Sequence, residues 1–541
     1  MQSESQERRI TYYQPRELLF LVTYQDDLDD AQIHKLFDWA NSLALKDSAH
    51  LSRHRVLRFP ATPQREYPDV QQTQTSPGIR YKSPKVVQRG PFALIFADVE
   101  FADDKKNETN STALVELIRR LDDDRSKHLV PGLTVELVSP DWLTSGASET
   151  SGTGGPGGRP VPFRGAADTE EYEFHLPKGI EAICPEKELR GRGVAVAILD
   201  TAPCLHDLVA AYEHWQKVDP RLNRSDHHRL IQSLLRPDGP LHVHPASYDD
   251  LLRMRSVHLD EHEYSMTDHG LFVAGIIHTI APSAELHLVE VLNPDGVGDL
   301  QSIAEGLDWV VQNLSQRPLV VNLSLILNIP LEERHRQDGL LITDRKSLER
   351  YGQPLEWMCD LLYALQSRVI AAAGNDGEER GNRPQARYPA AFDRIVGVGA
   401  LPKLDDPPQA AGAASYSNLS DNPQIVGITT LGGEATEGVP RNERVTLEAE
   451  GVLGLYIGQF PPGPGSGHGP PNINNWAWWC GTSFAAPIIS GVTAAVLGSM
   501  MAAATRSGMP TPTTEQAIRK LYEAQAIVTI EDEDVLFVKQ G

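Results

Sequence analysis

The stretch Gly481–Met500, with the sequence GTSFAAPIISGVTAAVLGSM, contributes most to the prediction of the fold. It begins with small residues, contains Pro487 and continues as an apolar run typical of a helix buried on several sides. Ser483 stands at the start of this predicted helix, where backbone N–H groups and the helix dipole favour a developing negative charge. A serine there can be a simple N-cap, but its small neighbours leave room for a ligand at the hydroxyl.

Upstream of this helix, apolar runs rich in β-branched residues alternate with helical patterns. The runs lie at 194–199, 286–291, 319–325, 369–373 and 395–398, and helical patterns lie at 299–314 and 355–366. Strands that are apolar throughout are buried on both faces, so the alternation predicts right-handed βαβ units in an α/β fold with a mostly parallel sheet flanked by helices. Functional residues of such sheets gather at the carboxyl ends of the strands.

Three polar residues stand where a predicted strand ends or a predicted helix begins. Asp200 ends the first strand, either as a carboxylate that orients a histidine or as a ribose-binding or structural residue. His269 precedes Gly270 at the start of a helical pattern, either as a general base, a role that suits the pKa of histidine, or as a capping or core residue. Asn375 could donate to an oxyanion, although the surrounding Gly-Asn-Asp-Gly sequence also favours a turn.

The strand VVNLSLIL at Val320–Leu327 has two interpretations. It could offer an edge to which an extended peptide adds by β-augmentation, or it could be plain core.

Four motifs in this order resemble those of the subtilisin-like (S8) serine protease family over about residues 180–530. They are ILDTA at Ile198–Ala202, HGLFVAG at His269–Gly275, AAAGND at Ala371–Asp376 and GTSFAAP at Gly481–Pro487. The resemblance implies a serine endopeptidase with a polypeptide substrate, in which Ser483 is the nucleophile, His269 the general base, Asp200 its orienting partner and Asn375 an oxyanion donor. It also implies a substrate-binding set of Ser324, Leu325, Ile326, Ala373 and Gly374.

Several residues differ from the pattern of the family. The family usually has Gly at Ala202, Thr and His at Leu271 and Phe272, and Met at Phe484, and it often has Gly at Ile326. These differences predict an altered substrate cleft, and they support an alternative in which the fold is catalytically silent and binds peptides or acts as a scaffold. A nucleotide-binding protein is disfavoured because no GxGxxG opens a helix.

The N-terminal region, residues 1–144, shows a βαββαβ pattern that predicts a ferredoxin-like α+β domain. A Gly/Ser/Pro-rich linker is predicted over 145–178, and the peptidase domain over 179–541. Family propeptides are commonly ferredoxin-like and inhibit by laying their C-terminal tail in the cleft. The N-terminal domain is therefore expected either to dock on the cleft in this way or to bind a regulatory protein.

Composition restricts the partners and the compartment. The 541 residues carry a net charge of −23, which a phosphate backbone would repel, so nucleic acid is not expected as a partner. The N-terminus lacks an apolar signal region, and the longest apolar stretch, near Val492–Ala504, is too short to span a membrane. Four widely spaced cysteines disfavour a disulfide framework. These features predict a cytoplasmic protein without a membrane span.

Two segments are expanded relative to the family core, at 204–268 and 430–479. The first contains eight histidines: His206, His214, His227, His228, His242, His244, His258 and His262. It lacks HExxH, and the adjacent pair in it would point apart in a strand, so a solvated insertion beside the cleft is preferred to a metal site. No cofactor is predicted. The family often binds structural calcium, for which no ligands can be assigned.

Overall fold

The computed structural model describes the larger part of the chain. The described residues are 13–63, 84–102, 112–127, 130–146, 160–163, 173–218, 239–247, 266–329, 345–377, 383–402, 412–420, 427–434, 451–460, 469–472, 475–524, 526–530 and 533–540. The predicted loop over 61–88 and four of the histidines of the first expansion (227, 228, 258 and 262) lie mainly or wholly outside these ranges.

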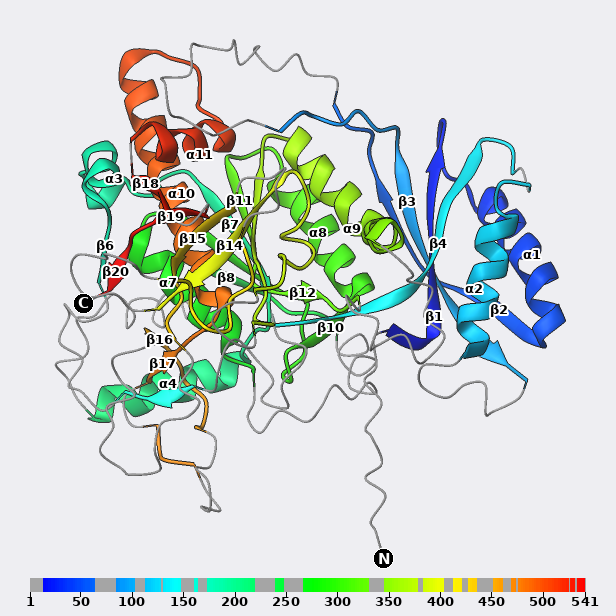
Figure 1. Ribbon diagram of the computed structural model, residues 1–541, viewed down its shortest axis with the longest axis horizontal. Coiled ribbons are helices and arrows are strands. Elements are labelled where there is room, and N and C mark those ends of the chain that lie inside the picture. Colours follow the sequence, from blue (N-terminus) through cyan, green and yellow to red (C-terminus); the bar gives the residue numbers. More distant parts are fainter. Residues whose placement is uncertain are drawn as a thin grey trace, which may run out of the picture.

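The N-terminal region forms a four-stranded antiparallel sheet with two helices. Its elements are β1 (Tyr13–Tyr24), α1 (Asp30–Ala44), β2 (Ala49–Phe59), β3 (Phe92–Phe101), α2 (Thr112–Asp124) and β4 (Leu133–Ser145). The strand order is β4-β1-β3-β2, and all neighbours are antiparallel. The helices cover one face of this sheet (Figure 1). This is the βαββαβ order predicted from the sequence, with the apolar side of α1 buried at the predicted positions Ile33, Leu36, Phe37 and Ala40.

The larger part of the chain is built on a nine-stranded sheet. Its strands, in spatial order, are β18 (Ile527–Ile530), β19 (Glu533–Leu536), β15 (Gly427–Leu431), β14 (Ile395–Leu401), β13 (Arg368–Ala372), β11 (Leu319–Leu323), β7 (Ala195–Asp200), β9 (Glu285–Glu290) and β8 (Leu241–His244). All neighbours are parallel except β18 and β19. The mostly parallel sheet is therefore confirmed, and its central strands are buried on both faces.

Helices cover both faces of this sheet. They are α3 (Lys178–Ile183), α4 (Leu205–Val218), α7 (His269–Ile280), α8 (Leu300–Leu314), α9 (Arg345–Ala364), α10 (Thr482–Ser507) and α11 (Thr514–Glu523). One core joins α7 and α10 to one face of the sheet, and a second core joins α8, α9 and the N-terminal sheet to the other. The helices α8 and α9 thus lie between the two sheets (Figure 1).

The central helix α10 is long and apolar enough to cross a membrane by length and composition alone. In the structure 89% of its most apolar window is buried inside the protein. The helix is longer than the apolar stretch noted in the sequence because it starts at Thr482 and continues through small residues that pack closely.

Short strands connect the predicted linker to the rest of the protein. In the described part of 145–178, β5 (Val161–Pro162) pairs with β17 (Trp476–Trp479), which pairs with β16 (Val452–Leu455). Further along, β6 (Phe174–His175) pairs with β20 (Lys539–Gln540). Within the predicted Gly/Ser/Pro-rich linker, backbone pairing with distant strands thus orders these residues.

The strand β4 links the two halves of the protein. It was predicted to end near Val138, but it continues to Ser145, where it pairs antiparallel with β10 (Val297–Asp299) and β12 (Ile326–Leu327). The end of β4 thus lies between two strands of the larger unit. The stretch Val320–Leu327 satisfies both of its interpretations: β11 is core, and β12 accepts an extended segment from the same chain.

Candidate active site

Asp200 and His269 form the buried centre of the site. Asp200 ends β7, and His269 begins α7; both side chains are inaccessible to solvent. His269 Nδ1 lies 2.7 Å from Asp200 Oδ1, which also accepts a hydrogen bond from the backbone N–H of Thr201. A carboxylate on Nδ1 fixes the ring orientation and leaves Nε2 available as a base.

Gly270 permits this approach of α7 to the end of β7. A Cβ at this position would lie 2.1 Å from the Thr201 carbonyl oxygen and 2.9 Å from the Cβ of Asp200. The Thr201 hydroxyl also accepts a hydrogen bond from Gly270 N at 3.1 Å. A residue with a side chain at this position would therefore force α7 away from β7.

Ser483 lies in the first turn of α10, fully buried. Its hydroxyl is 3.4 Å from the carbonyl oxygen of Ser324, whose own hydroxyl donates to the Ser483 carbonyl at 2.8 Å. The next residue, Phe484, contacts the His269 ring, with centroids 5.4 Å apart. Within the described residues His269 Nε2 has no hydrogen-bond partner. The structure thus joins the start of α10 to His269 through Phe484, and the Ser483 hydroxyl is turned to Ser324.

Asn375 follows β13 and faces the start of α10. Its Oδ1 accepts hydrogen bonds from Thr482 N at 3.0 Å and from the Thr482 hydroxyl at 2.8 Å, while its buried Nδ2 has no partner among the described residues. The Thr482 hydroxyl in turn accepts from Gly374 N at 3.2 Å. Thr482 therefore fixes the orientation of the amide so that Nδ2 remains free to donate. The sequence analysis gave Thr482 no role, although it is part of the GTSFAAP motif.

An aromatic cluster surrounds the imidazole. Trp479 meets the His269 ring edge-on at 5.7 Å, and Phe272 packs against both Trp479 and Phe484. Phe272 and Phe484 are two of the residues at which the chain differs from the family pattern. Both are fully buried, so they enclose the base and keep water from it on this side.

The residues proposed to bind substrate take different positions. Ile326 pairs with Ser145 in the β12–β4 ladder, and Ser324 contacts Ser483. Ala373 and Gly374 directly follow β13, and Gly374 has φ +112°, a conformation that glycine adopts most readily. Leu325 is fully buried within the core.

A pocket of about 730 Å³ opens beside the predicted base. Asp207, Asp268, Ile457 and Asn472 are among its lining residues. Asp268, which directly precedes His269, accepts hydrogen bonds from Ile457 N and Gly458 N. Burial outweighs these bonds and raises the pKa of Asp268 to about 6. The sequence analysis missed this residue, because nothing in the local pattern distinguishes it from other acidic residues before a helix.

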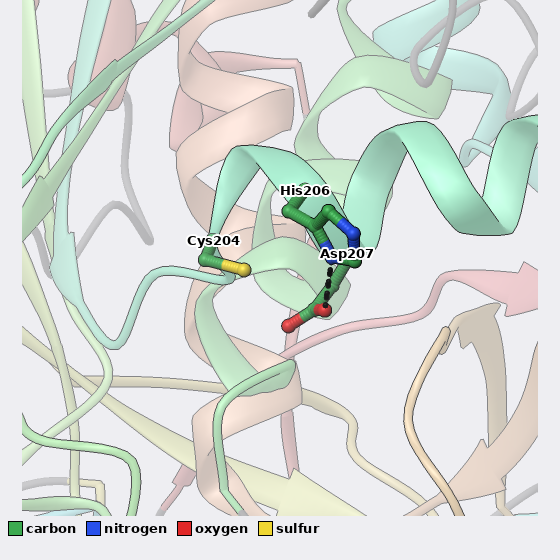
Figure 2. Close-up of side chains that lie close together, drawn as sticks. All are labelled: Cys204, His206 and Asp207. Atoms are coloured by element: carbon green, nitrogen blue, oxygen red, sulfur yellow. Dashed lines mark hydrogen bonds and ion pairs between the residues drawn. The ribbon is translucent and has the colours of Figure 1, made fainter.

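Two groups of described residues bring three possible metal ligands within 4.8 Å of one another. One is Cys204, His206 and Asp207 at the start of α4 (Figure 2). All three are exposed, so their side chains are not held in a ligating geometry. Burial and the hydrogen bond with Asp207 raise the pKa of the Cys204 thiol, which disfavours the thiolate that metals bind.

The second group is Glu17, Asp141 and Asp299, buried where the N-terminal sheet meets α8. Asp299 accepts from Ser302 N at 2.8 Å, and Asp141 from Gln301 N at 3.2 Å. Two of the carboxylates are thus used to cap α8, and we assign no calcium ligands in the described part of the chain.

Asp200, His269, Asn375 and Ser483 thus stand at ends of strands or starts of helices on a mostly parallel α/β sheet. The family model described as Subtilase family matches residues 191–529, more than half of the chain, and the chain belongs to this family.

Relatives match over shorter stretches. The minor extracellular protease Epr of Bacillus subtilis (strain 168) is 32% identical over 162 residues, 28% of this chain and 20% of that protein. Subtilisin DY of Bacillus licheniformis is 29% identical over 173 residues, 29% of this chain and 52% of that protein. An extracellular serine proteinase of Thermus sp. (strain Rt41A) is 44% identical over 204 residues, 36% of this chain and 42% of that protein. The chain thus spans about a fifth to a half of these relatives.

Two solved structures match more than half of the chain. One is a cold adapted subtilisin-like serine proteinase, with 17% identity, a TM-score of 0.34, and coverage of 64% of this chain and 89% of that one. The other is a lanthipeptide protease, with 20% identity, a TM-score of 0.37, and coverage of 61% of this chain and 79% of that one. At these scores the likenesses carry no argument about the site.

Proposed function

We propose that the protein is a serine endopeptidase. Ser483 Oγ attacks the carbonyl carbon of the scissile peptide bond as its proton passes to His269 Nε2, and Asp200 stabilises the resulting imidazolium. The C–N bond then breaks, Nε2 gives the proton to the leaving amine, and an ester remains on Oγ. A water molecule that loses a proton to Nε2 hydrolyses this ester and restores the hydroxyl.

The oxyanion is stabilised by the side chain of Asn375 and the backbone N–H of Ser483. The observation that carries this proposal is the set of unpaired buried polar atoms. His269 Nε2 and Asn375 Nδ2 have no partner in the described protein, and burying such atoms unpaired costs about 1–3 kcal/mol each. Both atoms gain hydrogen-bond partners when a tetrahedral intermediate forms on Ser483. The free-energy cost of leaving them unpaired is therefore removed selectively in the transition state.

We further propose that the N-terminal domain is ferredoxin-like and inhibits the peptidase unit. The order β4-β1-β3-β2 supports the fold. The inhibition is supported by Ser145 and Thr144 of β4, which pair with β12 on one side and β10 on the other, as an extended peptide substrate would. Gly146 continues this pairing with a hydrogen bond from its N to Gly296 O at 3.0 Å.

Anchors outside the cleft support a tightly held N-terminal domain. Arg89 stacks on Trp357 of α9 at 4.3 Å and donates to the buried Asp360 at 2.7 Å. Arg55 of β2 pairs with Glu305 of α8 at 2.9 Å. These contacts border the apolar core shared by α8, α9 and the N-terminal sheet. The body of the domain would therefore remain bound after a cut that lets the end of β4 leave the cleft.

Labelling with a serine-directed fluorophosphonate probe tests the activity. The full-length protein, incubated until any self-cleavage is complete and supplied with a denatured protein substrate, is expected to react with the probe and to cleave the substrate. Ser483→Ala should do neither, and Ser507→Ala, at an exposed position near the end of the same helix, should behave as the wild type. Equal labelling of the wild type and Ser483→Ala would refute the proposed nucleophile.

The alternative of a catalytically silent, peptide-binding fold is favoured by one observation. The Ser483 hydroxyl is directed to Ser324 O and forms no hydrogen bond with His269. Hydrogen bonds of catalytic groups are often poorly aligned without substrate, so the peptidase remains the preferred proposal. A protein that retains peptide binding but shows no labelling and no cleavage would establish the alternative. Both functions require a polypeptide partner. The cytoplasmic location stays a prediction.

A further inference from the structure

Three histidines lie side by side at the edge of the nine-stranded sheet. His242 and His244 alternate along the edge strand β8, so they share one face, and His287 of β9 pairs directly with His242. The His287 ring stacks on both others, with centroids 5.1 Å from His242 and 5.4 Å from His244. The strand β8 belongs to the His-rich insertion at 204–268, whereas β9 belongs to the core of the sheet.

An ordered chain of contacts fixes the tautomer of His287. Arg317 holds the carboxylate of Glu285 through both oxygens, with NH1 donating to Oε1 at 2.9 Å. Oε1 also lies 3.0 Å from His287 Nε2. A carboxylate requires a donor, so Nε2 carries the proton and the lone pair of His287 is on Nδ1.

This lone pair faces a second imidazole nitrogen. His287 Nδ1 and His244 Nε2 are 3.1 Å apart. Two nitrogens bound to one zinc-like ion at about 2.0–2.1 Å, with a bond angle of about 90–110°, are separated by about 2.9–3.4 Å. The observed separation therefore suits chelation of one ion. A histidine ligand whose other nitrogen donates to a carboxylate is also the usual arrangement around bound metals.

Side chains of neighbouring elements enclose the pair. Trp309 of α8 covers the His244 ring, with centroids 4.0 Å apart. The groups that face the pair are His242 on β8, Glu285 on β9, Trp309 on α8 and Arg317 after α8.

We propose that His244 Nε2 and His287 Nδ1 form a binding site for a divalent late transition-metal ion of the Zn²⁺ class. Glu285 orients His287 from behind, and water completes the coordination. The ion connects the edge strand of the insertion to the sheet. This site is independent of the proposed peptidase activity.

Metal titration of the full chain tests the proposal. The protein, freed of metal by a chelator, is titrated with Zn²⁺ in a calorimeter and with Co²⁺ by visible absorption, and its melting temperature is followed with Zn²⁺. One Zn²⁺ per chain is expected to bind at this site and raise the melting temperature. His244→Gln should weaken this binding at least tenfold and abolish the shift, and Glu285→Gln should weaken it about 10–100-fold.

Matched variants separate this site from the exposed cluster on α4. His206→Gln and Cys204→Ser should leave the affinity unchanged, and circular dichroism should show that every variant is folded. Equal Zn²⁺ affinity in the wild type and folded His244→Gln would overturn the proposal. So would a loss of the high-affinity binding in Cys204→Ser, because the ion would then belong to the cluster of Figure 2.

Discussion

Ser145 pairs in antiparallel register with Ile326, two residues beyond Ser324, whose carbonyl oxygen lies 3.4 Å from the Ser483 hydroxyl. In an antiparallel ladder each step forward on one strand is a step back on the other. From Thr144 to Ser145, β4 therefore runs from Leu327 towards Ile326, in the direction of Ser324. This direction supports the proposal that the N-terminal domain presents its own chain to the site.

From this direction of the chain we predict self-cleavage shortly after Gly146. Intact mass spectrometry with N-terminal sequencing should find a new chain that begins shortly after Gly146 in the wild type and an uncut chain in Ser483→Ala. Both fragments should elute together in gel filtration, because the anchors on α8 and α9 are unaffected by the cut. A wild-type chain that stays intact while it is fully active would contradict the inhibitory role of the domain.

Replacement of Thr482 should impair catalysis through Asn375. Thr482→Val removes the hydroxyl that holds Asn375 Oδ1, so kcat should fall while KM changes little. The loss should be smaller than that of Asn375→Ala, for which about 10²–10³ in kcat is expected, an order of magnitude transferred from subtilisin. Thr493→Val on the same helix is the matched control, because the Thr493 hydroxyl has no partner among the described residues. Equal kcat in the two valine variants would exclude the positioning role.

Gly270→Ala should destabilise the protein by about 3 kcal/mol. Its Cβ would overlap the Thr201 carbonyl at 2.1 Å, and because that atom belongs to the backbone, α7 must move away from β7. Urea unfolding in a Ser483→Ala background, which prevents self-digestion, measures the free energy of unfolding. Gly412→Ala is the control, since a Cβ there meets nothing within 4 Å. Similar stability of the two alanine variants would show that the close approach is not rigid.

The stability of the protein should depend on pH through Glu356. Burial, and next the neighbouring Asp360, raise the pKa of Glu356 from 4.5 to about 7 in the folded state. The folded state thus favours the neutral form, so the contribution of Glu356 to stability is full below about pH 4.5 and is lost as the pH rises towards 7. Glu356→Gln should therefore be more stable than the wild type at pH 8, by up to about 3 kcal/mol, and similar at pH 4.5.

Chemical denaturation of Glu356→Gln and the wild type across this range, in the Ser483→Ala background, checks the sign. Glu116→Gln, at an exposed position on α2, is the control and should follow the wild type. A difference between Glu356→Gln and the wild type that does not change with pH would contradict the prediction.

Local patterns located most elements but misplaced those that depend on distant partners. The helix α9 was predicted from residue 355, yet it begins at Arg345 and passes through Pro354. Packing of its apolar face against α8 and the N-terminal sheet maintains the helix across the proline. In the same way, Pro140 does not end β4, since β10 and β12 supply new partners beyond it.

The candidate site was predictable where chemistry follows directly from a motif. Asp200, His269, Asn375 and Ser483 stand at ends of strands or starts of helices, and the parallel sheet brings such ends together. Thr482 was missed because its role is to orient another side chain. Asp268 was missed because only its burial in the folded protein distinguishes it from other acidic residues.

The sequence by itself determined the parallel sheet, the order of the four motifs and the two-helix N-terminal unit, since periodicity records which faces are buried. Only the tertiary structure decided that residues 143–146 lie between β10 and β12, and that His244 faces His287 across β8 and β9. The physical reason is that register between distant segments depends on the packing of the whole core, and a one-residue shift would point every side chain to the opposite face.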